Sequence, residues 1–244
     1  MTNKSFNQWL AGLIDGKGSL LWSKKNYGSL EIIMNIKDER TLYIIKKIYG
    51  GSIKIRAGSN SIRYRLKSKL DLIKLINNIN GEIRNPKRLL ELSKLCSKYN
   101  IELKYPEELT YENGWLSGIF DSVGEIKINE PGSETGERSY LSISITHNTL
   151  DILKPLINLY NGSIYIDNYK YNSYKWEIKT KNDIINILNY FELNRSRTLK
   201  WNRVQLINKY YDINEKYNIE KGINITLEKI KQQFYKDWER NIYI

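Results

Sequence analysis

Apolar and polar residues follow two different spacings along this chain, and the two spacings alternate. Residues 39–49 (ERTLYIIKKIY) place apolar side chains three and four positions apart, which predicts a helix that ends at the two glycines after it. Residues 52–57 (SIKIRA) and 61–67 (SIRYRLK) alternate strictly instead, and predict the two strands of a hairpin that turns at GSN. The chain is therefore expected to combine helices with antiparallel strands.

The same reading extends to both sides of these segments. A short apolar helix is predicted over 7–15, followed by strands over 19–24 and 30–35. Helical spacing returns over 69–79 and again over 86–99. The first hundred residues thus predict one unit in which a helix and two strands are followed by a second helix, two more strands and closing helices.

This unit occurs twice. Three segments return in the same order, and the offset between the copies grows from 106 to 112 residues: WLAGLID (9–15) returns as WLSGIFD (115–121), YGGSIKI (49–55) as YNGSIYI (160–166), and YRLKSKLDLI (64–73) as WEIKTKNDII (176–185). Ordered matches of this kind indicate a duplicated unit. We predict a first repeat over 1–100, a linker over 101–112, a second repeat over 113–212 and a C-terminal helical extension over 213–244.

The predicted strands carry basic side chains on one face. Because successive side chains of a strand point to opposite faces, Ile53 and Ile55 are expected to pack on helices, and Lys54 and Arg56 to face outward. Other basic residues expected on this outer surface are Arg63, Arg65, Lys67, Lys24 and Lys25. The second repeat is more aromatic there, with Tyr165, Tyr169, Lys170, Tyr171, Tyr174 and Lys175.

The net charge supports a polyanionic partner. The formal charge is +12 and the pI is near 9.4. Lysine and arginine bind phosphates and aromatic rings stack on unpaired bases, so nucleic acid is the expected ligand. A solvated sheet face on a merely basic protein is the alternative.

Other residues have simpler interpretations. The single Cys96 lies at helical spacing from Leu89 and Leu92 and is predicted to be a buried core thiol, and the single His147 is predicted to be a loop or cap residue. No apolar run approaches the roughly 18 residues of a membrane-spanning helix, so no membrane partner is expected. Asn, Ile, Lys and Tyr are abundant and share A/T-rich codons, which favours an A/T-rich genome such as an organellar one.

The first matching segments of the two repeats extend to LAGLIDGKG (10–18) and LSGIFDSVG (116–124). They resemble the two signature motifs of the LAGLIDADG family of homing endonucleases and intron-encoded maturases, and the resemblance extends over nearly the whole chain. It implies an α+β fold of two pseudo-symmetric αββαββα units in one monomer, with two antiparallel sheets forming a saddle. The motif helices must then meet closely, and the small residues that permit this are Ala11, Gly12, Ser117 and Gly118.

The resemblance also shows what is missing. In the family's nucleases the eighth residue of each motif is an acid that binds a divalent metal, whereas these positions hold Lys17 and Val123 here. We therefore expect no metal at the motif site and no DNA cleavage in the family's manner. Asp15 and Asp121, at the sixth positions, and Glu125 are the alternative ligands.

The expected roles of the motif residues are otherwise structural. Asp15 and Asp121 are expected to accept hydrogen bonds from backbone N–H groups in the turns that follow them. Lys17 is expected to form a salt bridge with a carboxylate across the pseudo-twofold axis or to contact a nucleic-acid phosphate.

Three functions remain open. The preferred one is a maturase that binds a group I intron RNA and stabilises its folded form for splicing, while Mg²⁺ is needed by the RNA. Here the chain resembles mitochondrial intron maturases of yeasts, those of cytochrome b introns among them, which implies an organelle-encoded protein of the mitochondrial matrix. The alternatives are an active double-strand DNA homing endonuclease with displaced carboxylates and a non-cleaving, sequence-specific DNA-binding repressor.

Two surfaces are candidates for RNA binding. One is the basic saddle described above. The other lies near the C-terminus, where a basic group is predicted beside Trp201: Arg195, Arg197, Lys200 and Arg203. A basic, aromatic helix over 227–244 follows it and has no counterpart after the first repeat.

Overall fold

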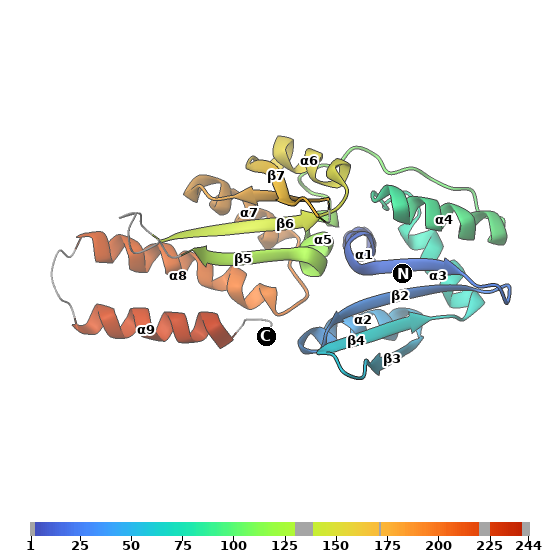
Figure 1. Cartoon of the computed structure of the whole chain (residues 1–244), viewed down its shortest axis with the longest axis horizontal. Helices are drawn as coiled ribbons and strands as arrows, with labels where there is room; N and C mark the ends of the chain where they lie inside the picture. The colour runs from blue at the N-terminus through green and yellow to red at the C-terminus, as the bar shows by residue number, and fades with distance from the viewer. Residues whose placement is uncertain (1–2, 130–138, 171, 220–224, 241–244) are drawn as a thin grey trace.

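The computed structural model describes residues 3–129, 139–170, 172–219 and 225–240, and Figure 1 shows two similar halves beside a central pair of helices. The first half contains, in order, α1 (Lys4–Lys17), β1 (Gly18–Trp22), β2 (Gly28–Asn35), the 3₁₀ turn η1 (Ile36–Asp38), α2 (Glu39–Tyr49), β3 (Ser52–Ile55), β4 (Ser61–Leu66), α3 (Lys69–Ile79) and α4 (Pro86–Tyr99). The second half contains α5 (Trp115–Val123), β5 (Gly124–Asn129), β6 (Tyr140–His147), α6 (Leu150–Tyr160), β7 (Ser163–Asn168), β8 (Ser173–Ile178), α7 (Lys181–Leu193), α8 (Lys200–Ile219) and α9 (Ile225–Arg240).

Local signals explain many of these bounds. The helices α2, α3 and α4 begin and end at the predicted residues. Helix α1 begins earlier than predicted because the side chain of Asn3 accepts a hydrogen bond from the backbone N of Ser5 (3.0 Å) and caps it. Strand β1 ends at Trp22, so Lys24 and Lys25 lie in the turn that follows and not in the strand.

Each half contains one four-stranded antiparallel sheet. The strand order is β1-β2-β4-β3 in the first half and β5-β6-β8-β7 in the second. The first strands pair in the same way, with Gly18 opposite Ile32 and Gly124 opposite Ile145. Helices α2 and α3 pack on the first sheet and α6 packs on the second. The predicted α+β fold with two antiparallel sheets in duplicated units is thereby confirmed.

The sheets turn an apolar face to the helices. In β4, Ile62, Tyr64 and Leu66 are buried, and the arginines between them are partly exposed on the other face. The prediction for Ile55 is wrong, since 67% of this residue is exposed. Ile55 is the last residue of a four-residue edge strand, and alternation alone does not bury such a position.

A helix covers one edge of each sheet. At edge strand β1, the backbone N of Leu20 donates to Glu91 of α4 (2.9 Å). At edge strand β5, the backbone O of Ile126 accepts from Arg203 of α8 (2.8 Å). Both edges therefore have polar backbone groups bound by a helix, which makes α8 the counterpart of α4.

The C-terminal part departs from the predicted division. Helix α8 continues to Ile219, so the boundary predicted between 212 and 213 lies inside a helix. Helix α9 packs against α8 and buries Phe234 and Trp238. Residues 241–244 of the predicted terminal helix, and Tyr171 of the predicted aromatic surface, lie outside the described residues.

The two residues with simple interpretations in the sequence, Cys96 and His147, have different outcomes. Cys96 is buried. His147 is the last residue of β6 and not a loop or cap residue, and its Nδ1 accepts from the backbone N of Thr149 (2.9 Å), just before α6. Within the part of the chain that the structure describes, no helix combines the length and the apolar character needed to cross a membrane.

Candidate functional site

Helices α1 and α5 meet with their backbones in close approach. A Cβ added to Gly12 would overlap the carbonyl oxygen of Trp115, and one added to Gly118 would overlap that of Trp9. The other small residues predicted at this contact are also buried, namely Ala11 and Ser117. The absence of larger side chains is therefore what lets the two halves meet here.

Each motif aspartate is bound by the opposite half of the molecule. Asp15 Oδ2 accepts a hydrogen bond from Trp115 Nε1 (2.7 Å), and Asp121 Oδ2 accepts one from Trp9 Nε1 (2.8 Å). The sequence predicted partners in the turn after each helix instead. The aspartates do have a structural role, but it is to join the two halves.

The same carboxylates bind a backbone N–H of their own half. Asp15 Oδ2 accepts from Arg84 N and Asp121 Oδ2 from Arg197 N, both at 2.8 Å. The guanidinium groups of these arginines lie over the tryptophans of the opposite half, at 5.9 Å for Arg84 and 5.1 Å for Arg197. Sequence reasoning missed this reciprocal arrangement, although the tryptophan at the start of both motif segments was a signal.

The two aspartates differ in their second oxygen. Asp121 Oδ1 accepts hydrogen bonds from the hydroxyl groups of Ser196 and Thr198. Among the described residues, no donor reaches Asp15 Oδ1, which is buried. Burial raises the pKa of Asp15 to about 7, although its bonds from Arg84 N and Trp115 Nε1 act in the opposite direction.

A cavity of about 330 Å³ lies where the motif helices end. Lys17 and Val123 both line it, with Asp38, Glu125 and Lys200 around them. The cavity therefore lies at the two positions where the family resemblance implied acids.

Lys200 is placed differently from the prediction. The sequence put it in an exposed basic group, but it is only 9% exposed, and its Nζ donates to the backbone O of Phe120 (2.7 Å) and Asp121 (2.9 Å). These carbonyls belong to the last turn of α5, where a cation is favourable. Burial lowers the pKa of Lys200 to about 8, against the opposing effect of Asp121 and with a smaller contribution from the nearby Lys17.

The carboxylate nearest in effect to Lys17 is Asp38, which belongs to the same half of the molecule. Burial lowers the pKa of Lys17, and Asp38 partly offsets the effect. Asp38 follows β2 in the first repeat. The ion pairs of the described residues include none that joins Lys17 to a carboxylate across the pseudo-twofold axis, as one of the two predictions required.

Carboxylates neutralise part of the basic saddle. Arg63 and Arg65 both bind Glu31 on the neighbouring strand. On the second sheet, Glu177 lies near Lys175 (3.8 Å) and binds further groups, Lys179 (2.9 Å) and the hydroxyl of Tyr165 (2.8 Å). The saddle therefore presents less uncompensated charge than its sequence suggests.

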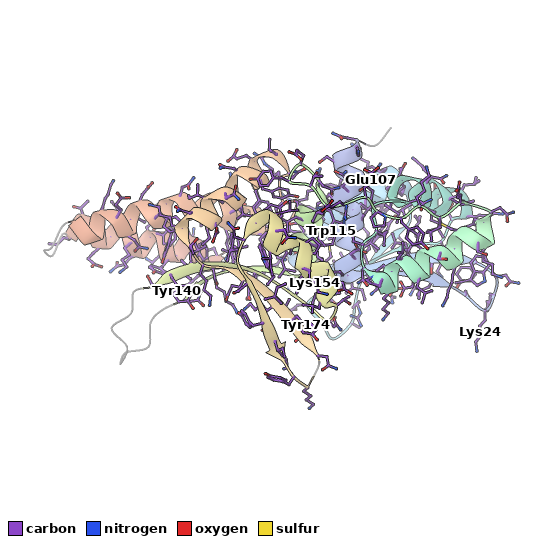
Figure 2. The ribbon with its side chains drawn as sticks, turned by 90° about the horizontal axis from the view of Figure 1, so that it is seen from above. Lys24, Glu107, Trp115, Tyr140, Lys154 and Tyr174 are labelled. Carbon is purple, nitrogen blue, oxygen red and sulfur yellow. The ribbon has the colours of Figure 1, made fainter. Side chains whose placement is uncertain are left out.

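The other predicted cations of the saddle lie on strands and turns at its rim. Lys24, Lys25, Lys54, Arg56, Lys67 and Lys170 are all exposed. Seen from above, Lys24 and Tyr174 lie toward one side of the molecule (Figure 2), and Glu107 lies toward the other.

The other predicted basic residues near the C-terminus lie on two sides of α8. Arg195 is exposed, with its guanidinium 4.5 Å from the Trp201 ring. Arg203 is half-buried and lies 4.7 Å from the Trp238 ring of α9, in addition to its bond to the edge strand. Arg203 therefore holds α9 and β5 to α8.

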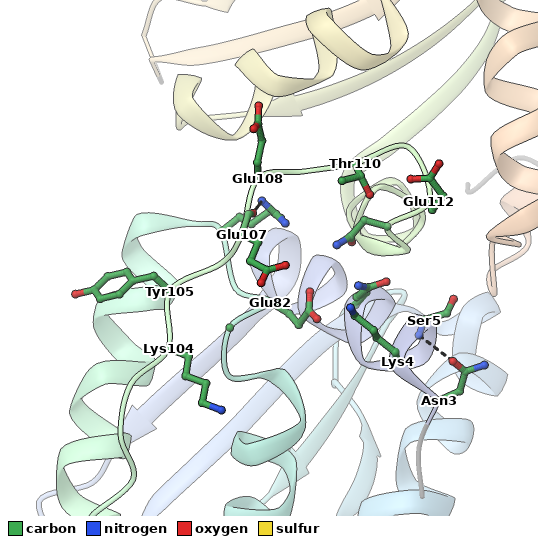
Figure 3. Close-up of a pocket in the computed structure, with 14 residues that line it drawn as sticks. Asn3, Lys4, Ser5, Glu82, Lys104, Tyr105, Glu107, Glu108, Thr110 and Glu112 are labelled. Carbon is green, nitrogen blue, oxygen red and sulfur yellow. Dashed lines mark hydrogen bonds between the residues drawn. The ribbon is translucent and has the colours of Figure 1, made fainter.

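The linker side of the molecule has the opposite character. A cavity of about 610 Å³ lies between the linker and the start of α1, and Figure 3 shows Glu82, Glu107 and Lys4 among its lining residues. Glu108 and Glu112 add further negative charge there. A polyanion is disfavoured on this side.

The profile of a family described as LAGLIDADG endonuclease matches residues 10–99 and 116–211. The chain belongs to this family. Three relatives are similar over nearly all of it: "Intron-encoded RNA maturase bI4" of Saccharomyces cerevisiae (39% identity, covering 98% of this chain and 38% of the relative), "Probable intron-encoded endonuclease aI2" of Debaryomyces hansenii (37%, 97% and 38%) and "Intron-encoded DNA endonuclease ai2a" of Dictyostelium discoideum (37%, 98% and 76%). The chain thus spans less than half the length of the first two.

Solved structures of LAGLIDADG proteins share this fold. The meganuclease I-AabMI bound to uncleaved DNA superposes with a TM-score of 0.69 at 21% identity, covering 93% of this chain and 98% of that one. The homing endonuclease I-LtrWI bound to target DNA gives 0.68 at 17% identity, covering 96% and 97%. At these identities the likeness establishes the two-sheet saddle fold alone.

The LAGLIDADG fold implies a divalent metal at the motif helix ends, and the residues present here do not fit one. Asp121 accepts four hydrogen bonds from protein donors and has no oxygen left for a metal. Glu125 pairs with Lys127 (2.9 Å), and Asp38 Oδ1 accepts from Leu199 N (2.9 Å). In the described ranges no three His, Cys, Asp or Glu side chains form a group able to hold a metal ion.

Proposed function

We propose that this chain is an RNA-binding maturase that assists the splicing of a group I intron and does not cleave DNA at its motif helices. One observation carries the proposal: the two positions where the family's nucleases need acids hold Lys17 and Val123, and both line the cavity at the helix ends. Without acids at these two positions, a LAGLIDADG protein can still bind nucleic acid, and binding is the function that we propose.

The chemistry of cleavage explains why this observation supports a loss of cleavage. Metal-assisted hydrolysis of a phosphodiester needs hard oxygen ligands that hold Mg²⁺, activate water and stabilise the leaving oxygen. An ammonium 4 Å from a divalent ion is repelled by ~8 kcal/mol at an effective dielectric constant near 20. Lys17 therefore opposes metal binding and Val123 offers no ligand, so we propose that the protein binds no metal there.

In this proposal the RNA is the catalyst and the protein shifts its folding equilibrium. A protein that binds the folded intron more tightly than the unfolded one stabilises the folded form by mass action. The similarity to a relative named RNA maturase supports this role, and the basic charge of the chain supports binding to a polyanion. The Mg²⁺ requirement belongs to the RNA, and we place the protein in the mitochondrial matrix because its relatives are named intron-encoded and its composition fits an organellar gene.

A splicing assay tests this function. Precursor RNA containing the intron that encodes the chain is incubated at a Mg²⁺ concentration where the RNA alone splices slowly, with and without protein. We expect the protein to raise the splicing rate, and an unrelated group I precursor to show no such increase. An unchanged rate with the cognate precursor would contradict the proposal.

A DNA endonuclease is the second candidate, because other relatives over the same length are named endonucleases. A supercoiled plasmid that carries the joined exons distinguishes the two. We expect it to remain intact with the protein in Mg²⁺ or Mn²⁺. Appearance of the linear form would show that displaced carboxylates support cleavage. Binding competition between intron RNA and the intronless DNA then separates a maturase from a repressor, for which the DNA would bind more tightly.

A further inference from the structure

A second cavity lies between the two repeats, beside the motif helix ends. It has a volume of about 290 Å³ and lies between η1 with the first turn of α2 and the segment that leads into α8. Lys37, Arg40 and Arg197 supply positive charge to its lining, and Trp201 supplies an aromatic ring. We call this cavity the inter-repeat corner.

Hydrogen bonds between the repeats hold the walls of the inter-repeat corner. Thr41 Oγ1 donates to the backbone O of Arg197, and Leu199 N donates to Asp38 Oδ1 (2.9 Å). Asp38 is the acid in the lining, and it is buried with this backbone bond. The cations thus surround a cavity whose shape is fixed by both halves.

The inter-repeat corner combines two features of nucleotide recognition. The first is a group of three cations beside the start of α2, namely Lys37, Arg40 and Arg197. The second is a flat surface, formed by the guanidinium of Arg195 over the indole of Trp201 at 4.5 Å. Unpaired bases of RNA stack on aromatic rings and on arginine planes alike.

The corner related to this one by the pseudo-twofold symmetry lies between the start of α6 and the segment before α4, and it has different chemistry. Arg40 is the second residue of α2, and the second residue of α6 is Asp151. Arg195 lies two residues before Arg197, and the same step before Arg84 leads to Glu82. Arg84 and Arg197 are equivalent because each backbone N binds the motif aspartate. The basic, aromatic corner is therefore particular to one side of a duplicated fold.

We propose that the inter-repeat corner binds one nucleotide of a single-stranded segment of RNA, with its phosphate among Lys37, Arg40 and Arg197 and its base on the Arg195–Trp201 plane. This inference rests on the proposed function and adds to it the place of contact. It assigns unpaired RNA to the corner and leaves duplex nucleic acid to the saddle.

The test uses the full chain with two matched double variants. Arg40→Gln with Arg195→Gln removes two exposed cations, one from the lining of the corner and one from the face of Trp201. Lys47→Gln with Lys209→Gln removes the same charge from exposed positions further along α2 and α8. Binding is measured with labelled precursor RNA, a labelled single-stranded oligoribonucleotide and duplex DNA, each over a series of salt concentrations.

We expect the corner variant to bind the oligoribonucleotide at least ~10-fold more weakly than wild type, with a salt dependence shallower by about 0.7 for each phosphate that the variant no longer neutralises. The control variant should bind within about 3-fold of wild type, and duplex DNA should not distinguish the two variants. In addition, Trp201→Phe should reduce the quenching of tryptophan fluorescence by the oligoribonucleotide.

Each contrary result has a separate meaning. Equal binding of RNA by the two double variants would overturn the corner and leave the proposed function standing. Failure of wild type to bind the precursor RNA would overturn the proposed function. Full competition by free AMP at millimolar concentration would show a site for a free nucleotide, and would overturn its assignment to RNA.

Discussion

At the scale of single residues, the two motif aspartates show how environment separates identical side chains. Both accept an indole N–H from the opposite half and a backbone N–H from their own. Two hydroxyl groups complete the shell of Asp121, whereas no described donor reaches Asp15 Oδ1. A buried carboxylate with half of its acceptors unused holds a proton more easily, so the pKa of Asp15 rises to about 7.

This difference predicts opposite results for two amide substitutions. Because the pKa of Asp15 is raised from 3.8 to about 7, its contribution to stability is lost as the pH rises through that range, by up to about 4 kcal/mol. Asp15→Asn should remove this loss. Between pH 4 and pH 7 the free energy of unfolding of the variant should therefore increase relative to that of wild type. Urea titrations at several pH values measure the free energy of unfolding of both proteins. Parallel dependence on pH in the two proteins would contradict the prediction.

Asp121→Asn serves as the comparison for that substitution. Its amide group would meet donors already bound to the carboxylate, and hydrogen bonds to a charged group are worth about 1.5–3 kcal/mol each. We expect a loss of at least ~2 kcal/mol at neutral pH for this variant.

At the scale of elements, the contact between α1 and α5 depends on the lack of a side chain at two positions. Alanine normally stabilises a helix relative to glycine by ~1 kcal/mol, because glycine loses more backbone entropy on folding. Here the added Cβ would overlap the backbone of the opposite helix at Gly12 and at Gly118. The steric effect should therefore reverse the usual sign.

Gly12→Ala and Gly118→Ala should each lower the free energy of unfolding by more than ~3 kcal/mol or prevent soluble expression. Gly58→Ala is the control, because a Cβ there meets nothing within 4 Å although the φ angle is +72°. It should cost only about 1 kcal/mol of conformational strain. Thermal unfolding of the three variants checks this. A motif variant as stable as wild type would show that the helices are not in van der Waals contact there.

Elements and their contacts differ in how far the sequence predicts them. The bounds of α2, α3 and α4 follow from spacing, glycines and a first-turn proline, all of which act within a few residues. The burial of Lys200 depends on how α8 packs against the end of α5, about 80 positions away, and local charge patterns carry no information about it. The Trp–Asp bonds join residues still further apart in the sequence, and only the repeated tryptophans gave a sign of them.

At the scale of the whole molecule, the net charge of +12 is unevenly spread. Glutamates occupy the linker side, and Glu31 and Glu177 compensate cations on the saddle. The sequence correctly predicted that the basic side chains of β4 point away from the helices. It could not show which cations are paired, since the pairing of Arg65 with Glu31 depends on the register between β2 and β4.

This pairing predicts that removing a single negative charge strengthens the binding of duplex DNA by the saddle. Glu31→Gln removes the charge that compensates Arg63 and Arg65. The affinity for duplex DNA should then rise by roughly 5-fold at moderate salt, equivalent to about 1 kcal/mol for a unit charge near a phosphate in water. Its salt dependence should steepen by up to about 0.9 for each arginine released.

The control for this experiment is Glu102→Gln, which makes the same change in net charge on the exposed linker. An equal gain in both variants would mean that the saddle is not the surface in contact with DNA.

The exchange of Trp and Asp partners between the halves also governs how the protein unfolds. A repeat that separated from its neighbour would leave an indole N–H and a carboxylate without partners on each side, in addition to the exposed helix pair. Duplicated architecture would ordinarily permit one repeat to melt before the other. These reciprocal bonds instead favour a single cooperative transition, and two fragments cut within the linker should remain associated as a folded pair.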